Sequence, residues 1–323
     1  MRLVLRALAL RALAFLTTTA GAVLLVSVCF ALVPGDAIDA LPNGPELRAQ
    51  LEGEWGLVGG PAERVLGTFS RAGRLDFGHS LTVSPGAPVA ELMGSAAARS
   101  ARLLAPAALL SLLAGFAGAA LAGAGAELPP SPWRPRLVRA LASLSALPAV
   151  LAALATVNGV NALAWPLIES ARLTRPVWFA LPETDHPVRS FLAVIVLTGA
   201  SGSFLWGVRR AGDTLADLAA RPFVGAERAR GGPIAPLLAR HLVVPAARMG
   251  AAHLPLLLSA LVVVERGFGM PGAGSLFWES CGRRDWPVTV GLAVVAAVTV
   301  TTARFVADAL AVVFDPRERA ALA

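Results

Sequence analysis

Two polar side chains in apolar stretches could do covalent chemistry together. Ser201 lies in the small-residue stretch Gly199-Ala200-Ser201-Gly202, and His253 lies in a later apolar run. A serine becomes a nucleophile when a neighbouring base accepts its proton. The pair is therefore a candidate dyad for an intramembrane serine hydrolase. Against this, small residues are common packing positions between membrane helices. A motif of only four residues, such as Gly199-Ala200-Ser201-Gly202, also occurs often by chance.

Other chemistries are excluded by residue type. The chain contains no lysine, so its 28 basic residues are all arginine. A P-loop ATPase needs a lysine at the phosphates of ATP, and Schiff-base chemistry needs one as the nucleophile. The two cysteines, Cys29 and Cys281, have no metal-ligand spacing and form no disulfide framework. We expect no metal site, no ATPase site and no cofactor bound by this chain.

The segments that must position these side chains are mostly apolar. Hydrophobic residues make up 56% of the 323 residues, charged residues only 15%, and the mean hydropathy is +0.66. Several apolar runs approach or exceed the ~20 residues that a membrane-spanning helix needs, and they lack the alternation of barrel strands. We predict an all-α membrane protein with about six transmembrane helices. The expected spans are residues 12–33, 103–123, 141–165, 191–208, 245–264 and 288–314.

The distribution of arginines predicts the topology. Arg2, Arg6 and Arg11 precede the first span with no acidic residue among them, and basic residues next to a span favour the cytoplasm. Six spans then return the C-terminus to the cytoplasm as well. This divides the chain into 1–33 (N-terminus and first span), 34–98 (a large outside loop) and 99–323 (the remaining spans). The net charge of +7 fits this placement better than nucleic-acid binding.

A polar insert between the fourth and fifth spans, residues 209–244, is predicted to be a cytoplasmic loop with its own helices. Asp213 is a candidate N-cap for a short helix that ends before Pro222. A second helical turn ends at Gly231-Gly232, where glycine permits a left-handed C-cap. Pro233 suits the start of a third helix that returns to the membrane. The insert is either a docking site for a partner protein or a solvated loop.

The insert resembles the cytoplasmic coupling loop of ABC-importer permeases of the dipeptide/oligopeptide/nickel class. That loop carries Glu-Ala-Ala, three residues and glycine, usually as Arg-Thr-Ala-Arg-Ala-Lys-Gly in this class. The first and third positions differ here. The positions that the resemblance assigns to coupling are Asp217, Gly225, Ala226, Glu227, Arg228, Ala229, Arg230 and Gly231.

The last quarter of the chain resembles the same class more specifically. Val262-Val263-Val264-Glu265 and the following residues resemble the class pattern Val-Val-Glu-x-x-Phe-x-x-Pro-Gly-x-Gly, and Asp285-Trp286-Pro287 resembles its Asp-Tyr-Pro. Pro34-Gly35-Asp36 and Asp76-Phe77-Gly78-x-Ser80-Leu81 resemble its N-terminal motifs. The assigned positions at the outer turn are Glu265, Phe268, Gly269, Pro271, Gly272, Gly274, Glu279, Asp285 and Pro287.

Two charged residues fall inside the sixth span. Arg304 and Asp308 are four residues apart, so they share a helix face and should pair with each other or face the bundle interior. Polar contacts between packed helices, without any role in binding a substrate, also explain both Asp308 and Glu265.

The resemblance implies a transport subunit without enzymatic activity in a bacterial inner membrane. Its implied partners are a second permease, two ATPase subunits that bind ATP and Mg²⁺, a periplasmic or lipid-anchored substrate-binding protein, and membrane lipid, but no nucleic acid. Its implied cargo is peptides or similar small solutes. Two alternatives stay open: a protease that resembles rhomboids through Gly-x-Ser-Gly at Ser201 with His253, and a degenerate scaffold that transports nothing.

Overall fold

The computed structural model describes residues 2–32, 61–74, 76–124, 131–169 and 187–314, and within them the chain forms eleven helices. The prediction of an all-α fold is confirmed. The sequence of the outside loop favours two short surface helices, at residues 47–58 and 62–69; the first lies outside the described residues, and the second is present within α3. The helices are α1 (Arg2–Ala31), α3 (Pro61–Gly73), α4 (Val89–Leu121), α5 (Trp133–Ser145), α6 (Ala149–Glu169), α7 (Pro187–Gly199), α8 (Ser203–Ala219), α9 (Pro222–Ala229), α10 (Ile234–Gly267), α11 (Ala273–Gly282) and α12 (Trp286–Phe314).

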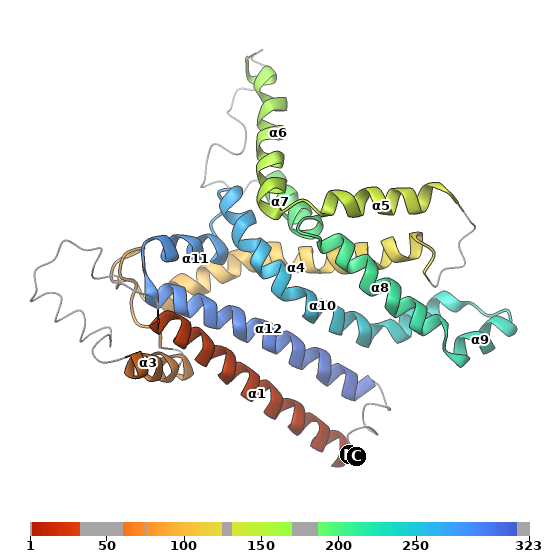
Figure 1. Ribbon diagram of the computed structural model, residues 1–323, viewed down its shortest axis with the longest axis horizontal. Coiled ribbons are helices and arrows are strands. Elements are labelled where there is room, and N and C mark those ends of the chain that lie inside the picture. The colour runs from red at the N-terminus through yellow and green to blue at the C-terminus, as the bar shows by residue number, and fades with distance from the viewer. Residues whose placement is uncertain (1, 33–60, 75, 125–130, 170–186, 315–323) are drawn as a thin grey trace, which may run out of the picture.

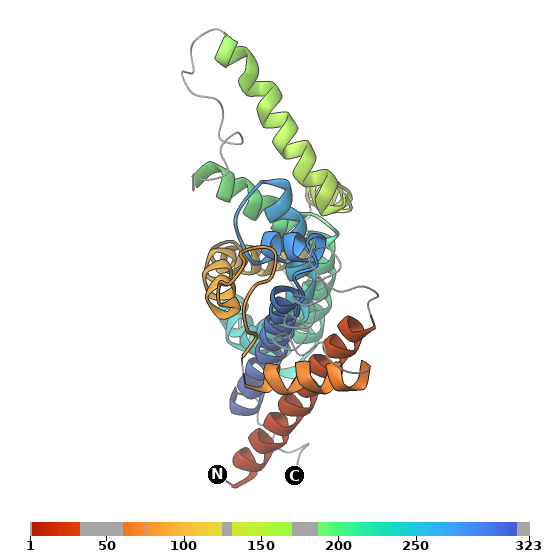
Figure 2. The ribbon, with the colours of Figure 1, turned by 90° about the vertical axis from the view of Figure 1, so that its left-hand side faces the viewer.

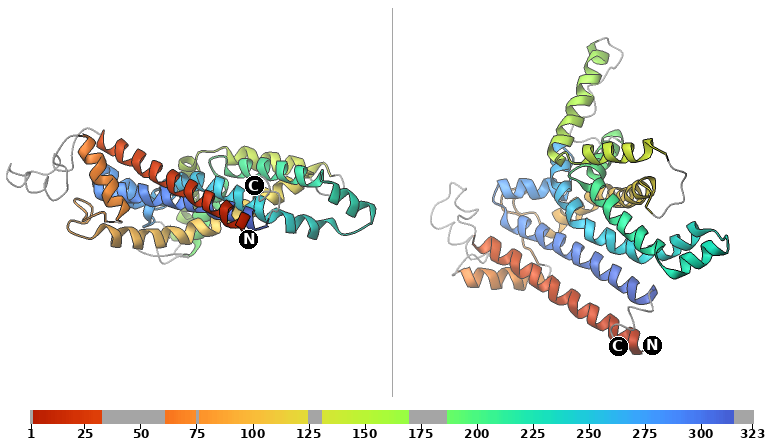
Figure 3. Two further views of the ribbon diagram at one scale, coloured as in Figure 1. Left: turned by 90° about the horizontal axis from the view of Figure 1, so that it is seen from below. Right: turned by 45° about the vertical axis from the view of Figure 1, so that its right-hand side comes forward.

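Among the described residues, four helices are long and apolar enough to span a membrane, and there are up to six spans if each of two bent helix pairs counts as one. The four are α1, α4, α10 and α12, so the chain is a multi-pass membrane protein. Figure 1 and Figure 3 show α1, α12 and α10 running side by side, with α4 and α8 packed together next to α10. Figure 2 shows α6 projecting away from this bundle.

The third and fourth predicted spans are each broken into two helices. α5 and α6 meet at 96° around Pro148, which cannot donate a backbone hydrogen bond. α7 and α8 meet at 54°, where Ser201 and Gly202 adopt positive φ angles of 55° and 77°. The predicted spans at 141–165 and 191–208 are therefore both bent, and a proline such as Pro148 within the third span is consistent with its bend.

The helices around the polar insert are longer than predicted. α8 runs unbroken from Ser203 to Ala219, so Asp213 is an interior residue and its assignment as an N-cap is wrong. Ala211 and Leu215 pack against α4 and α10, and this burial favours continuing the helix. α10 begins at Ile234 and continues through Pro245 and Pro255 to Gly267, so the prolines in the fifth span do not interrupt the helix.

α4 and α8 approach each other at paired glycines. A Cβ placed on Gly115 would lie 2.9 Å from the backbone carbon of Gly207. Small residues allow membrane helices to pack this closely, and the close contact is stabilised by van der Waals packing. The glycine pair therefore fixes α8, and with it the polar insert that α8 leads into.

Replacing Gly115 with alanine should destabilise the protein by about 1–3 kcal/mol, because the methyl group forces the two backbones apart. The measurement is the midpoint of thermal unfolding of the purified protein in detergent. Gly159 of α6 is a matched control because a Cβ there meets nothing within 4 Å. Gly159→Ala should leave the midpoint unchanged or raise it, and an equal loss in both variants would contradict the close approach.

Candidate functional site

The polar insert presents a short exposed helix on a buried base. α9 is anchored by Val224, which is fully buried and packs with Leu218 of α8 and Leu238 of α10. Phe223 adds a tilted ring contact with His241, with 4.6 Å between the ring centroids. The base therefore holds α9 in a defined position relative to α8 and α10.

Residues 225–231, which we call the tip, extend beyond this base. Glu227 is half-buried, and the other tip residues are exposed: Gly225, Ala226, Arg228, Ala229, Arg230 and Gly231. Apart from Asp217, these are the residues that the coupling-loop resemblance assigned. The structure brings them together as one small basic surface. Asp217 lies outside the tip, on α8, where it lines a cavity between α8 and α10.

Two glycines close the end of α9. Gly231 has a φ of +69°, so the predicted left-handed C-cap is present, and its N–H donates to the carbonyl of Arg228 at 3.0 Å. The Gly232 N–H donates to the carbonyl of Glu227, and a Cβ on Gly232 would lie 2.0 Å from a carboxylate oxygen of Glu227. The chain can reverse here tightly because neither position carries a side chain.

The outer turn at the other end of α10 is built around Glu265. This carboxylate is fully buried and accepts hydrogen bonds from the N–H groups of Gly274 (2.8 Å) and Ser275 (3.0 Å). The Ser100 hydroxyl of α4 donates to its other oxygen and itself accepts the N–H of Ala273 at 2.7 Å. Glu265 thus satisfies free N–H groups at the start of α11, where the helix dipole favours an anion, and ties α11 to α4.

The glycines of the Pro-Gly-x-Gly pattern make room for this carboxylate. A Cβ on Gly272 would lie 2.2 Å from Glu265 Oε1, and one on Gly274 would lie 2.6 Å from the Val262 Cα. Gly269 has a φ of +60°, and its carbonyl accepts a hydrogen bond from the Arg189 guanidinium at 2.8 Å. The other assigned positions complete the turn: Phe268 is buried in the core, and the exposed Pro271 offers its carbonyl to Arg99.

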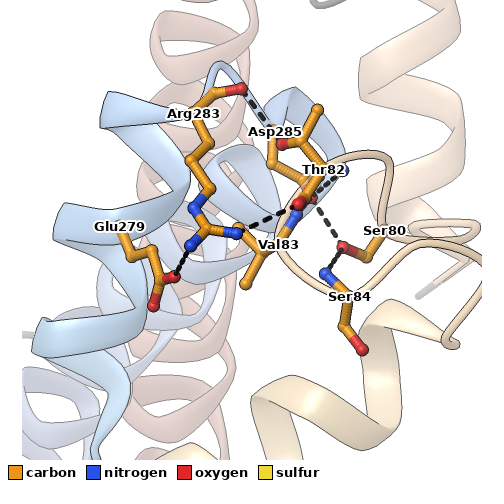
Figure 4. A network of polar contacts seen from close by, with 7 residues as sticks. All are labelled: Ser80, Thr82, Val83, Ser84, Glu279, Arg283 and Asp285. Carbon is orange, nitrogen blue, oxygen red and sulfur yellow. Dashed lines mark hydrogen bonds and ion pairs between the residues drawn. The ribbon is translucent and has the colours of Figure 1, made fainter.

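A second buried carboxylate joins two motifs that are distant in sequence (Figure 4). Asp285 accepts hydrogen bonds through Oδ2 from the Ser80 hydroxyl at 2.6 Å and from the N–H groups of Leu81, Thr82 and Val83. Arg283 donates to the carbonyl of Thr82 at 3.3 Å. The loop that carries the Asp-Phe-Gly-x-Ser-Leu motif is therefore fixed to the start of α12.

The remaining assigned positions at this end lie beside that contact. Glu279 forms an ion pair with Arg283 at 2.9 Å, one turn earlier on α11. Pro287 is the second residue of α12, where the missing N–H of proline costs nothing. Both positions support the ends of helices rather than a separate binding site.

Asp308 pairs with other helices and not with Arg304. Its Oδ2 lies 3.0 Å from an Arg11 nitrogen of α1, and its Oδ1 lies 3.6 Å from Arg248 of α10. Arg304 is exposed. Of the two predicted alternatives, pairing within the helix is not observed, and Asp308 instead faces the bundle interior. The contact also places the start of α1 beside the end of α12, as Figure 1 shows.

The structure does not bring Ser201 and His253 together. The Ser201 hydroxyl accepts the N–H of Ala149 at 2.9 Å, at the bend between α5 and α6. His253 instead contacts Ser203, with Nε2 and Oγ 3.2 Å apart, and stacks on Trp206. Ser203 is only 1% exposed, so a substrate cannot reach it. The predicted dyad is wrong, and the observed pair is a packing contact between α8 and α10.

Several residues in these networks were missed by sequence reasoning. Ser100, Arg11 and Ser203 lie in apolar or arginine-containing helices and have no sequence feature that marks their partners. Ser80 lies inside a recognised motif, but its link to Asp285 spans 205 positions. Long-range pairs of this kind become visible only when the helices are placed in space.

Comparison with known proteins found one informative relative, and no family model matches the chain. Over 55 residues the chain is 44% identical to the oligopeptide transport system permease protein AppB of Bacillus subtilis (strain 168). This stretch is 17% of the chain and 17% of the relative, so the chain covers about a sixth of the length of the protein it matches. The similarity confirms, over this stretch, the resemblance to oligopeptide-type permeases that the motifs indicated.

Proposed function

We propose that the chain is a permease subunit of an ATP-driven importer that moves peptides or similar small solutes across the bacterial inner membrane. The observation that carries this proposal is the tip, an exposed basic surface that is mounted on a buried base between two long helices. The multi-pass helical fold and the similarity to a permease agree with it. In this proposal the two ends of the chain and the tip face the cytoplasm.

Movement at the tip would reach the outer turn through α10. This helix has 34 residues and is therefore about 50 Å long at 1.5 Å per residue. The base of α9 packs on its first turns, and Glu265 lies in its last turn. Figure 3 shows α9 and α11 at opposite ends of the molecule. A partner that pushes the tip would thus tilt α10 as a near-rigid body and shift α11 with it.

The proposed assembly contains chains other than this one. A second permease would complete the translocation path, and two ATPase subunits would hold ATP and Mg²⁺ and push against the tip. A periplasmic or lipid-anchored binding protein would select the solute and dock on the outer surface, which includes residues 34–98 and 267–286. Membrane lipid surrounds the spans, and no nucleic acid takes part.

Reversing the charge at Arg228 and Arg230 should remove the ATPase subunit from the purified assembly. Both side chains are exposed on the tip, and like charges across an interface cost several kcal/mol. The measurement is quantitative mass spectrometry of proteins that copurify with the tagged full chain from its native membranes. We expect the double Arg→Glu variant to recover at least about tenfold less ATPase subunit than the unmodified chain.

The matched control is Arg134→Glu with Arg136→Glu, which makes the same charge change on α5. This control should retain the ATPase subunit. If the unmodified chain recovers no ATPase subunit at all, the proposed function is wrong. If both variants retain it, the tip is not the docking surface.

A further inference from the structure

A cavity of about 660 Å³ lies beside the tip, between α8, the start of α9, α10 and the end of α12. Its charged lining comes from four arginines and two acids on these helices: Arg210, Asp213, Asp217, Arg221, Arg240 and Arg248. The rest of the lining is largely apolar and includes Val244, Met249 and Phe314. The volume is within the range of sites for small molecules.

Of the four arginines that line this cavity, one is paired with a carboxylate. Arg248 contacts Asp308 at 3.6 Å. Within the part of the chain that the structure describes, Arg210, Arg221 and Arg240 have no carboxylate within ion-pair distance. Asp213 and Asp217 line the same cavity but do not pair with them. The charged lining therefore keeps an excess of positive charge, with four arginines against two aspartates, and three of these arginines have guanidinium groups available to an anion.

The residue type and the surroundings point to one class of anion. A guanidinium presents a planar fork of donors that matches the oxygens of carboxylate and of phosphate, and a phosphate has enough oxygens to accept hydrogen bonds from several guanidinium groups around one cavity. The apolar part of the lining suits a carbon chain attached to that phosphate. The proposed function places this end of the molecule at the cytoplasmic face, and basic pockets between helices at that face accept anionic lipid headgroups.

We propose that this cavity binds a phosphate ester, held by Arg210, Arg221 and Arg240. The ester is either the headgroup of an anionic phospholipid or a soluble phosphate compound. Because Arg210 lies on α8, Arg221 at the N-cap of α9 and Arg240 on α10, the bound anion joins all three helices at the base of the tip. Occupancy should hold α9 in place. The proposal does not depend on the identity of the protein partners.

The test compares phosphate probes on the full chain, purified in a mild neutral detergent. Native mass spectrometry measures binding of phosphatidylglycerol and of zwitterionic phosphatidylcholine, and competition is measured with sn-glycerol 3-phosphate and inorganic phosphate at constant ionic strength. The cavity variant is Arg210→Gln with Arg240→Gln. The control is Arg209→Gln with Arg304→Gln, which removes the same charge from two arginines that do not line the cavity. Size-exclusion chromatography identifies any variant that fails to fold, for which Arg210→Lys with Arg240→Lys is substituted.

We expect saturable binding of phosphatidylglycerol, at least about tenfold tighter than phosphatidylcholine, that weakens about tenfold or more in the cavity variant and not in the control. In a lysine variant the loss should be smaller but still measurable, because lysine keeps the charge and loses the fork. If glycerol phosphate or inorganic phosphate displaces the lipid, the source is soluble. If only lipid binds, the source is the membrane.

Three results would overturn the proposal. The cavity variant could bind phosphatidylglycerol and the soluble phosphates as tightly as the unmodified chain does. The control could also lose as much binding as the cavity variant. Alternatively, the cavity variant could keep phosphatidylglycerol but lose a copurifying protein, which would assign the arginines to a protein partner.

Discussion

From the proposed function we expect a chain with proline in place of Gly231 to insert in the membrane but to lose the coupling of ATP hydrolysis to uptake. Gly231 has a φ of +69° and donates its N–H to Arg228. Proline fixes φ near −65° and has no N–H, which costs about 3 kcal/mol or more at such a position. The end of α9 should unravel, so that the tip loses its shape while the buried base around Val224 remains.

The measurement is uptake of a labelled oligopeptide mixture by cells that carry the variant as their sole copy, together with ATP hydrolysis by the purified assembly. We expect uptake to fall at least about tenfold, which corresponds to 1.4 kcal/mol of lost coupling. Gly231→Asn is the matched control, because asparagine tolerates the left-handed region far better than other side chains do. Normal uptake with proline would show that the shape of the tip has no part in coupling.

The second large effect is expected at the opposite end of α10. Glu265→Leu should destabilise the protein by about 3 kcal/mol or more, because it leaves the N–H groups of Gly274 and Ser275 and the Ser100 hydroxyl buried without their acceptor. α11 should then detach from α4. Since the proposed function places α11 at the outer surface, uptake should fall as well.

Thermal unfolding in detergent measures the stability loss, and hydrogen exchange of the amides at positions 273–275 reports the detachment directly. The stability and amide protection of Glu265→Gln should lie between those of Glu265→Leu and of the unmodified chain, because the glutamine amide oxygen can still accept a hydrogen bond from one of these donors. Protection at these amides that is equal in Glu265→Leu and in the unmodified chain would refute the role of Glu265 as the cap of α11.

The positions of the long helices and of the tip could be predicted from sequence because they depend on local properties. Apolar length marks a span, and Gly231 marks the end of a helix whatever surrounds it. The motif positions Glu265 and Asp285 were also found. Their roles were not, because each depends on a partner far away in the chain: Ser100 for Glu265 and Ser80 for Asp285.

The wrong predictions share one cause, which is the rotation and length of helices in the packed bundle. Asp213 reads as a helix start, but Ala211 and Leu215 bury α8 against α4 and α10, and the helix continues past it. Arg304 and Asp308 share a helix face by spacing, yet Asp308 faces Arg11. Ser201 lies in the bend between α7 and α8, where its hydroxyl accepts the N–H of Ala149, and His253 contacts Ser203 instead. Tertiary packing decides each of these, and a single sequence does not contain it.

The measurement that tests the docking of the tip most directly is site-specific photo-crosslinking. A photoreactive amino acid placed at Ala226, which is exposed on the tip, should crosslink in native membranes to a protein that carries an ATP-binding P-loop. The same group at Leu137, which is 41% exposed on α5, should not. A crosslink from Ala226 to an ATPase subunit that disappears in Gly231→Pro is the result that our account predicts. Crosslinks from Ala226 to lipid alone, or equal crosslinking of the ATPase subunit from Leu137, would contradict it.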